Sequence, residues 1–200
     1  MRIGLFGGTF DPVHLGHLIV AERCREDARL DRVWFLPSFQ PPHKTDRPVS
    51  RFDHRAEMLA LATTAQPLFR VETIEKDLPP PSYTAETLAV LRAKYPDDEF
   101  HLVVGGDVPP DLPKWYQPQR VLEQAGLVVV PRPGTPAWTA GQLAAALGLP
   151  EAAVRMQVVL SPLVDIASRE IRRRVADGRT IRFLVPRSVE EYIREKKLYV

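Results

Sequence analysis

The chain opens with RIGLFGGTFDPVHLGH at positions 2–17. An apolar run over residues 2–6 ends at two glycines, which predicts a first strand and a sharp turn. Apolar residues then recur at helical spacing from Leu15 to Ala28, so a helix should follow the turn. This segment therefore predicts a strand, a glycine-rich loop and a helix, in that order.

The same alternation continues to the end of the chain. Further strands are expected at 33–36, 68–74, 100–104, 127–130 and 156–160. Helices are expected at 52–63, 84–94, 117–125, 142–147 and 168–176, and a last one opens at Ser188, where Glu191 completes a capping box. Near-continuous apolar strands between helices indicate an α/β fold, a doubly wound parallel sheet of five to six strands covered on both faces. We expect a single domain over residues 1–200, with a C-terminal helical segment at about 168–200 packed on it.

Composition excludes several classes of protein. The 200 residues are 44% hydrophobic and 26% charged, as in globular proteins. A net charge of +2 is too balanced for a protein whose partner is bulk nucleic acid or a membrane surface. The single cysteine, Cys24, excludes a disulfide framework and a cysteine-rich zinc module. The first apolar run is too short for a secretion signal and no run is long enough to span a bilayer, so we expect a cytoplasmic protein.

The loop after the first strand is the strongest candidate for ligand binding. Parallel sheets bind ligands at the carboxyl ends of their strands, where the strand order reverses. A helix that begins near His14 offers free N–H groups and a positive dipole end to an anion. His14 and His17 share one helix face and can donate to phosphate oxygens, and Gly16 between them should leave room for the phosphate. Two alternatives remain open: a zinc-binding histidine pair, and histidines without a ligand.

This loop resembles a known signature. Gly8-Thr9-Phe10-Asp11-Pro12 followed by His14-Leu15-Gly16-His17 is similar to the phosphate-binding signature of the nucleotidylyltransferase superfamily, with its His-x-Gly-His motif. The resemblance implies a Rossmann-like fold. It also implies transfer of a nucleoside monophosphate from a triphosphate to a phosphate-bearing acceptor, with release of pyrophosphate.

Other segments are similar, in order over nearly the whole chain, to bacterial nicotinate-nucleotide adenylyltransferases. They are Pro41-Pro42-His43-Lys44, His54-Arg55-Ala56-Glu57-Met58-Leu59, Pro81-Ser82-Tyr83-Thr84-Ala85-Glu86-Thr87-Leu88, Gly105-Gly106-Asp107, Lys114-Trp115-Tyr116, and Phe183-Leu184-Val185-Pro186 through Tyr192-Ile193 to Leu198-Tyr199. The resemblance implies adenylyl transfer from ATP to nicotinic acid mononucleotide, giving deamido-NAD and pyrophosphate in NAD biosynthesis. Mg²⁺ is expected to accompany ATP, and no metal ligands are assigned.

The resemblance also implies which residues face ATP. The catalytic candidates are His14, His17, Lys44 and Arg172. The full set expected to bind ATP is Gly7, Gly8, Thr9, Phe10, His14, His17, Gly105, Asp107, Ser168 and Arg172. Asp107 suits a ribose hydroxyl or the adenine side, and a helix N-cap is its ordinary alternative. Lys44 can place a point charge on a phosphate, and the alternative is a solvated surface lysine.

The acceptor should lie on another set of residues. The candidates are Lys44, Tyr83, Thr84, Ala85, Trp115 and Tyr116. The Trp115 indole suits stacking on the cationic pyridine ring, and the alternatives are a core or subunit-contact tryptophan, which leaves a homo-oligomer open. Free N–H groups where a helix starts near Thr84 could grip the substrate carboxylate and distinguish the acid from the amide. A Thr84 N-cap is the alternative.

One segment departs from the family pattern, Ile-Ser-Ser-Thr-x-Ile-Arg. Here it reads Ile166-Ala167-Ser168-Arg169-Glu170-Ile171-Arg172, so two hydroxyl donors are lost and one cation is gained. Ser168, Arg172 and the helix start remain, and we expect activity to persist.

Two other functions stay open at this point. The first is a related nucleotidylyltransferase with another acceptor, such as nicotinamide mononucleotide or phosphopantetheine. The second is a non-catalytic nucleotide-binding module. A His14–His17 pair favours catalysis, because a sensor does not need both imidazoles.

Overall fold

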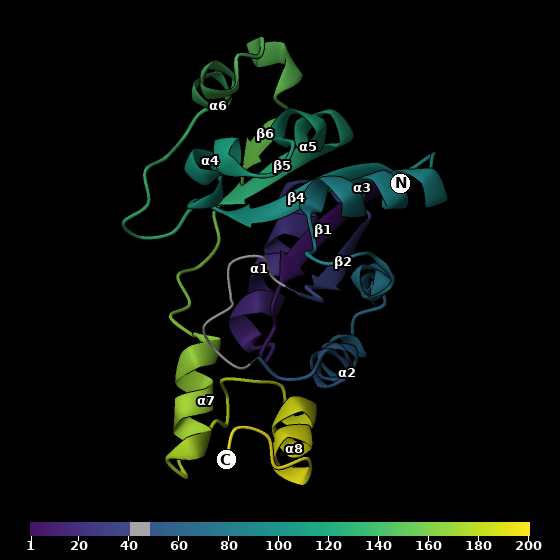
Figure 1. Cartoon of the computed structure of the whole chain (residues 1–200). Coiled ribbons are helices and arrows are strands. Elements are labelled where there is room, and N and C mark those ends of the chain that lie inside the picture. Colours follow the sequence, from purple (N-terminus) through teal and green to yellow (C-terminus); the bar gives the residue numbers. More distant parts are fainter. Residues whose placement is uncertain (41–48) are drawn as a thin grey trace.

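The computed structural model describes residues 1–40 and 49–200. Its centre is a six-stranded sheet with the order β3-β2-β1-β4-β5-β6, and every neighbouring pair of strands is parallel (Figure 1). The strands are β1 (Arg2–Gly8), β2 (Arg32–Pro37), β3 (Phe69–Val71), β4 (Glu99–Gly105), β5 (Ala125–Val130) and β6 (Met156–Val158). The strand order reverses between β1 and β4, as in doubly wound sheets. The expected α/β fold class is confirmed.

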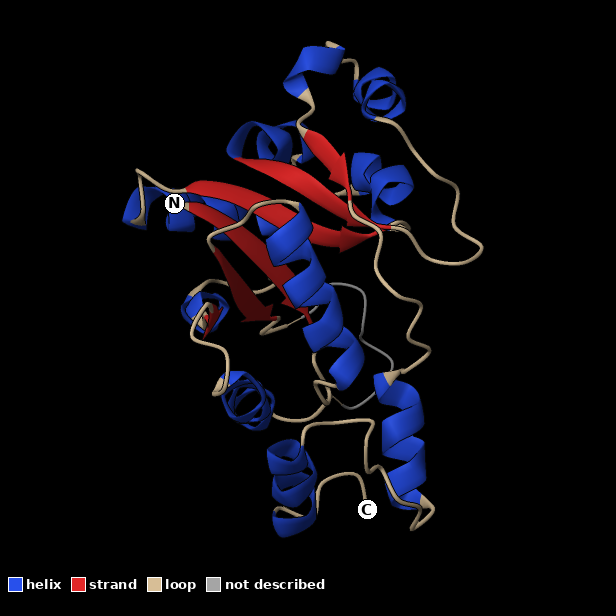
Figure 2. Ribbon diagram, turned by 180° about the vertical axis from the view of Figure 1, so that it is seen from behind, coloured by secondary structure: helices blue, strands red, loops and turns tan. Residues whose placement is uncertain are grey.

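Helices cover both faces of the sheet (Figure 2). The α-helices are α1 (Leu15–Asp27), α2 (Phe52–Thr63), α3 (Thr84–Lys94), α4 (Val108–Asp111), α5 (Pro118–Gln124), α6 (Ala140–Leu147), α7 (Ser168–Ala176) and α8 (Arg187–Glu195). Short 3₁₀ helices are η1 (Ile74–Asp77), η2 (Leu112–Lys114) and η3 (Glu151–Ala153). In the described residues, no helix is both long and apolar enough to cross a membrane.

The side-chain alternation of the strands builds two apolar cores. Along β5, Leu127 and Val129 join the core under α3, α5 and α6, whereas Val128 and Val130 join the core under α1, α2, α7 and α8. Because successive side chains of a strand point to opposite faces, an uninterrupted apolar run buries both. This is why the central strands are recognisable in the sequence.

Three expectations about the elements are wrong in detail. β3 ends at Val71 rather than at residue 74, because Ile74 already belongs to the 3₁₀ helix η1 and its side chain enters the core from that helix. β6 ends at Val158 rather than at residue 160. Both are edge strands with one neighbour each, so an apolar run there does not imply pairing along its whole length. The capping box at Ser188 is absent: α8 starts at Arg187, and the Ser188 hydroxyl donates to the Leu61 carbonyl of α2 at 3.2 Å.

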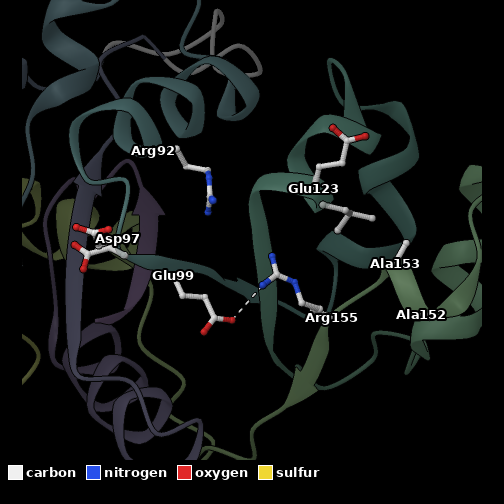
Figure 3. A pocket seen from close by; sticks show the side chains of 9 residues that line it. Arg92, Asp97, Glu99, Glu123, Ala152, Ala153 and Arg155 are labelled. Atoms are coloured by element: carbon white, nitrogen blue, oxygen red, sulfur yellow. Dashed lines mark hydrogen bonds and ion pairs between the residues drawn. The ribbon is translucent and has the colours of Figure 1, made fainter.

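A shallow hollow of about 600 Å³ lies at the amino ends of the strands, whereas the candidate loops lie at their carboxyl ends (Figure 3). Both positively and negatively charged side chains line this hollow, and Glu99 of β4 forms an ion pair with Arg155 at 3.1 Å. Among the residues that the structure describes, none of those expected to bind ATP or the acceptor lines it.

Candidate active site

A cavity of about 540 Å³ opens at the carboxyl ends of β1 and β4, where the strand order reverses. Among the residues expected from the sequence, its walls contain Gly7, Gly8, Thr9, Tyr83, Thr84, Gly105, Asp107, Trp115 and Tyr116. The fold therefore brings the loop after β1, the end of β4 and the start of α3 to one space. Phe10, His14, His17, Ala85, Ser168 and Arg172 do not line this cavity. Lys44 lies outside the described residues, so its role stays a prediction.

The two histidines of the first loop lie against each other. His14 is the N-cap of α1, and its backbone N–H donates to Nδ1 of His17 at 3.2 Å. Their rings stack, with centroids 3.6 Å apart and planes at 22°. Since Nδ1 of His17 accepts this hydrogen bond, the proton of the neutral ring is on Nε2, which can donate to a ligand. His17 therefore presents an imidazole donor at a helix start.

Both imidazoles are neutral at physiological pH. Burial lowers the pKa of His14 to about 4, and His14 is only 6% exposed. Burial also lowers the pKa of His17, and the charge that His14 gains on protonation and the charge of Arg132 lower it further. Neutral rings can donate hydrogen bonds to phosphate without bringing an unpartnered charge into the fold.

Acidification should therefore destabilise the unliganded protein through His14. The folded state binds fewer protons than the unfolded chain, whose imidazole pKa is near 6.5. Stability from the neutral ring is complete above about pH 6.5 and is lost as the pH falls toward about 4, by about 3 kcal/mol in total. Chemical denaturation of the wild type and of His14→Gln across this range measures the effect. Parallel pH curves for the two proteins would contradict it.

Two glycines on either side of the first loop, Gly8 at the end of β1 and Gly16 in α1, make room for rings of the protein itself. A Cβ on Gly16 would lie 3.1 Å from Nδ1 of His14, and a Cβ on Gly8 would lie 2.9 Å from the Phe10 ring. The expectation that Gly16 leaves room for a phosphate is thus wrong, because the His14 ring occupies that position. Phe10, with a positive φ of 49°, is 2% exposed and its ring packs on Phe35. Its side chain is part of the core, so the expected ATP contact is left to its backbone.

Ser168 and Arg172 meet the first loop rather than the cavity. The Ser168 hydroxyl donates to the Pro12 carbonyl at 2.9 Å, and the Arg172 guanidinium donates to the Asp11 carbonyl. The Arg172 side chain remains 31% exposed, so part of it is open to a ligand. Ala167, at a position where the resemblance implies a serine, is the N-cap of α7 and offers no side-chain acceptor to the first turn of that helix.

Sequence reasoning missed the buried charges that support this loop. The Asp11 carboxylate, 4% exposed, accepts from the Tyr199 hydroxyl at 2.7 Å and from the Ser50 N–H at 3.3 Å. Arg55, 2% exposed, donates to the Thr9 carbonyl at 2.8 Å. Both residues belong to the segments of family resemblance, but a charged side chain in a motif gives no sign that it is buried. Together with those of Ser168 and Arg172, these contacts hold residues 9–12 from three distant parts of the chain.

The start of α3 has unoccupied donors next to the cavity. Tyr83 is its N-cap and Thr84 its first residue, so the alternative of a Thr84 N-cap is wrong. The N–H groups of Glu86 and Thr87 bond to the Tyr83 carbonyl. Within residues 1–40 and 49–200, the N–H groups of Thr84 and Ala85 have no such partner. Thr84 lines the cavity, whereas Ala85 is fully buried in the core.

Aromatic side chains form the wall beside this helix start. Trp115 packs partly on the core and also faces the cavity, and its indole N–H donates to Asp111 at 3.4 Å. Tyr116 stacks on Tyr83, with ring centroids 4.5 Å apart and planes at 27°. Trp115 can therefore pack on the core and still offer its ring to a ligand in the cavity.

Asp107 and Arg132 also line the cavity. Asp107 is the N-cap residue of α4 but makes no side-chain cap bond there. Its carboxylate instead lies 3.5 Å from the guanidinium of Arg132, which follows β5. Arg132 was not among the expected residues, and its position after a strand end was the signal that could have found it. Its charge adds to the attraction of the cavity for anions.

The fold and the site define a nucleotidyltransferase of the cytidylyltransferase-like family, which matches residues 5–174. A probable nicotinate-nucleotide adenylyltransferase of Thermomicrobium roseum is 47% identical over 99% of this chain and 91% of the relative. Another, of Thermus thermophilus, is 44% identical over the full length of both. The chain belongs to the nicotinate-nucleotide adenylyltransferase family and is an enzyme of that family. Its fold is similar to that of Plasmodium falciparum nicotinic acid mononucleotide adenylyltransferase complexed with NaAD, with a TM-score of 0.78 and 17% identity, over 99% of this chain and 97% of that one.

Proposed function

We propose that the protein transfers the adenylyl group of ATP to nicotinic acid mononucleotide, releasing pyrophosphate and forming deamido-NAD. The observation that carries this proposal is the cavity shared by the loop after β1 and the start of α3. At the start of α3 the Thr84 N–H is open to an anion, and Arg132 adds a positive charge to the cavity, so a triphosphate and an acidic acceptor can bind in the same space.

The reaction needs alignment more than activation. The acceptor phosphate is already a nucleophile, and its oxygen attacks the α-phosphorus of ATP. A new P–O bond forms, the bond to the β-phosphate breaks, and pyrophosphate leaves with the bonding electrons. The enzyme has to hold the reactants in line and offset the charge that develops on the phosphates. We assign this task to the His14 and His17 imidazoles, to Arg132, and to Lys44 and the exposed part of Arg172.

The start of α3 would select the acid over the amide. Thr84 lines the cavity, and its N–H, which has no hydrogen-bond partner within the described residues, can bind the substrate carboxylate, whose charge also suits the helix start. The Trp115 indole offers a face to the cationic pyridine ring. Tyr83 and Tyr116 complete that wall.

Mg²⁺ belongs to this proposal as the counter-ion that ATP carries. In the described part of the chain, no group of three or more His, Cys, Asp or Glu side chains could hold a metal ion. We therefore assign the ion to the triphosphate oxygens, in keeping with the preference of Mg²⁺ for phosphate and water ligands.

The test is pyrophosphate release with Mg²⁺-ATP and one acceptor at a time. We expect turnover with nicotinic acid mononucleotide, and much slower turnover with nicotinamide mononucleotide or phosphopantetheine. Faster reaction with either of those two would assign the enzyme to another acceptor. ATP binding without pyrophosphate release for any acceptor would favour a non-catalytic module.

A further inference from the structure

Glu75 is a buried carboxylate in the cavity wall that the reaction described above does not use. It lies on η1 and is 9% exposed. Its Oε2 accepts a hydrogen bond from the Phe39 N–H at 3.2 Å. Phe39 belongs to the segment that follows β2, and Glu75 therefore joins that segment to η1.

The segment after β2 is joined in turn to the turn before α3. The Gln40 N–H donates to the Ser82 hydroxyl oxygen, and the Ser82 N–H donates to the Gln40 carbonyl, both at 3.3 Å. Glu75, Ser82 and Thr84 all line the same cavity. The segment after β2 thus meets two later segments, η1 and the turn before α3, around one carboxylate.

The electrostatics of Glu75 agree with a supporting role. Burial raises the pKa of Glu75, and this is opposed by hydrogen bonds with the Ser82 hydroxyl, the Phe39 N–H and the Thr87 hydroxyl, together with the charge of Arg55. A buried carboxylate is costly unless donors satisfy it. The donors here include groups from the two segments that Glu75 holds.

We propose that Glu75 is a positioning residue for the acceptor mononucleotide, holding residues 38–40 and 82–84 together so that the Thr84 N–H points at the acceptor. This inference rests on the proposed function, because the acceptor is what the Thr84 N–H would bind. The effect acts through position: a displacement of about 1 Å in a group that orients a substrate is enough to cost a large factor in rate.

The experiment compares Glu75→Ala with Glu72→Ala. Glu72 is the matched control, since it is 6% exposed, pairs with Arg70 at 2.7 Å and does not line the cavity. For Glu75→Ala we expect the KM for nicotinic acid mononucleotide to rise about tenfold, with the KM for ATP unchanged. Glu72→Ala should lower stability by a similar amount while leaving both KM values unchanged.

A conservative variant gives a second readout. In Glu75→Gln the amide oxygen still accepts from the Phe39 N–H, and the Ser82 hydroxyl can turn to accept from the amide NH₂. Its KM should therefore return to within about threefold of the wild type. If Glu75→Ala does not fold, Ser82→Ala removes one link of the same cluster and should raise the acceptor KM in the same direction.

The outcomes separate this inference from the proposed function. If the wild type does not use nicotinic acid mononucleotide, the function is wrong. If it does, and Glu75→Ala and Ser82→Ala both leave the acceptor KM unchanged, Glu75 has no positioning role. Equal increases of the KM for ATP and for the acceptor would also overturn the inference, because they would indicate general loosening of the site.

Discussion

His17→Ala should lower the rate of pyrophosphate release by about 10²–10³, because a donor that stabilises charge on the transferring phosphate is worth that much. The loss should fall on kcat, since the developing charge is greatest in the transition state. Folding should persist, because His17 lies in the first, partly exposed turn of α1. Circular dichroism and thermal unfolding would verify the fold alongside the kinetics.

Two further variants make the result specific. His17→Asn keeps an oxygen that can accept from the His14 N–H but lacks the ring Nε2–H. It therefore separates the hydrogen bond that holds His14 from the one donated to phosphate. His54→Ala is the matched control: this histidine also lies on a helix, but it bonds to the Tyr192 hydroxyl of α8 at 2.9 Å rather than to the loop after β1. A His17→Ala rate within about threefold of the His54→Ala rate would remove the histidines from the mechanism, because a phosphate donor is worth far more than that.

Thr84→Pro should remove the preference for the acid acceptor. Thr84 is the first residue of α3, where proline is tolerated because its missing N–H has no helical partner. Tyr83, with φ −84° and ψ 128°, already has the backbone conformation that a following proline requires. The substitution therefore deletes one N–H donor and leaves the helix in place.

The expected size of this effect is that of one hydrogen bond between a backbone N–H and a charged carboxylate. Its loss should lower kcat/KM for nicotinic acid mononucleotide by roughly 10- to 150-fold, with little change for the amide. Thr84→Ala is the control, because it loses the side chain and keeps the N–H. If Thr84→Pro reduced both acceptors equally, or if Thr84→Ala had the same effect, the carboxylate would have to bind elsewhere.

Much of the molecule could be predicted from local patterns. Apolar runs over β1, β2, β4 and β5 identify central strands, since both faces of those strands are buried. The double glycine and the His14–His17 spacing pointed to the correct end of the sheet, because ligands bind at the carboxyl ends of the strands where their order reverses. Edge strands were less predictable, since one neighbour imposes less on their sequence.

The candidate site was predictable in part. Tyr83, Thr84 and Trp115 do line the cavity. Their positions could be predicted because a helix start and an aromatic residue after a proline-rich loop are local signals. Glu75 was missed, because a single charged residue outside a motif shows nothing about its burial or its neighbours. Arg132 was missed although its position just after β5 was a usable signal.

The sequence by itself determined the succession of strands and helices, and it predicted that the reaction takes place at the carboxyl ends of the strands. Those properties follow from periodicity and from rules of chain connection. Only the tertiary structure decided that the His14 ring fills the space beside Gly16, and that Ser168 and Arg172 hold the first loop from more than 150 residues away. Contacts of this kind depend on which distant segments pack together, and local patterns carry no record of that.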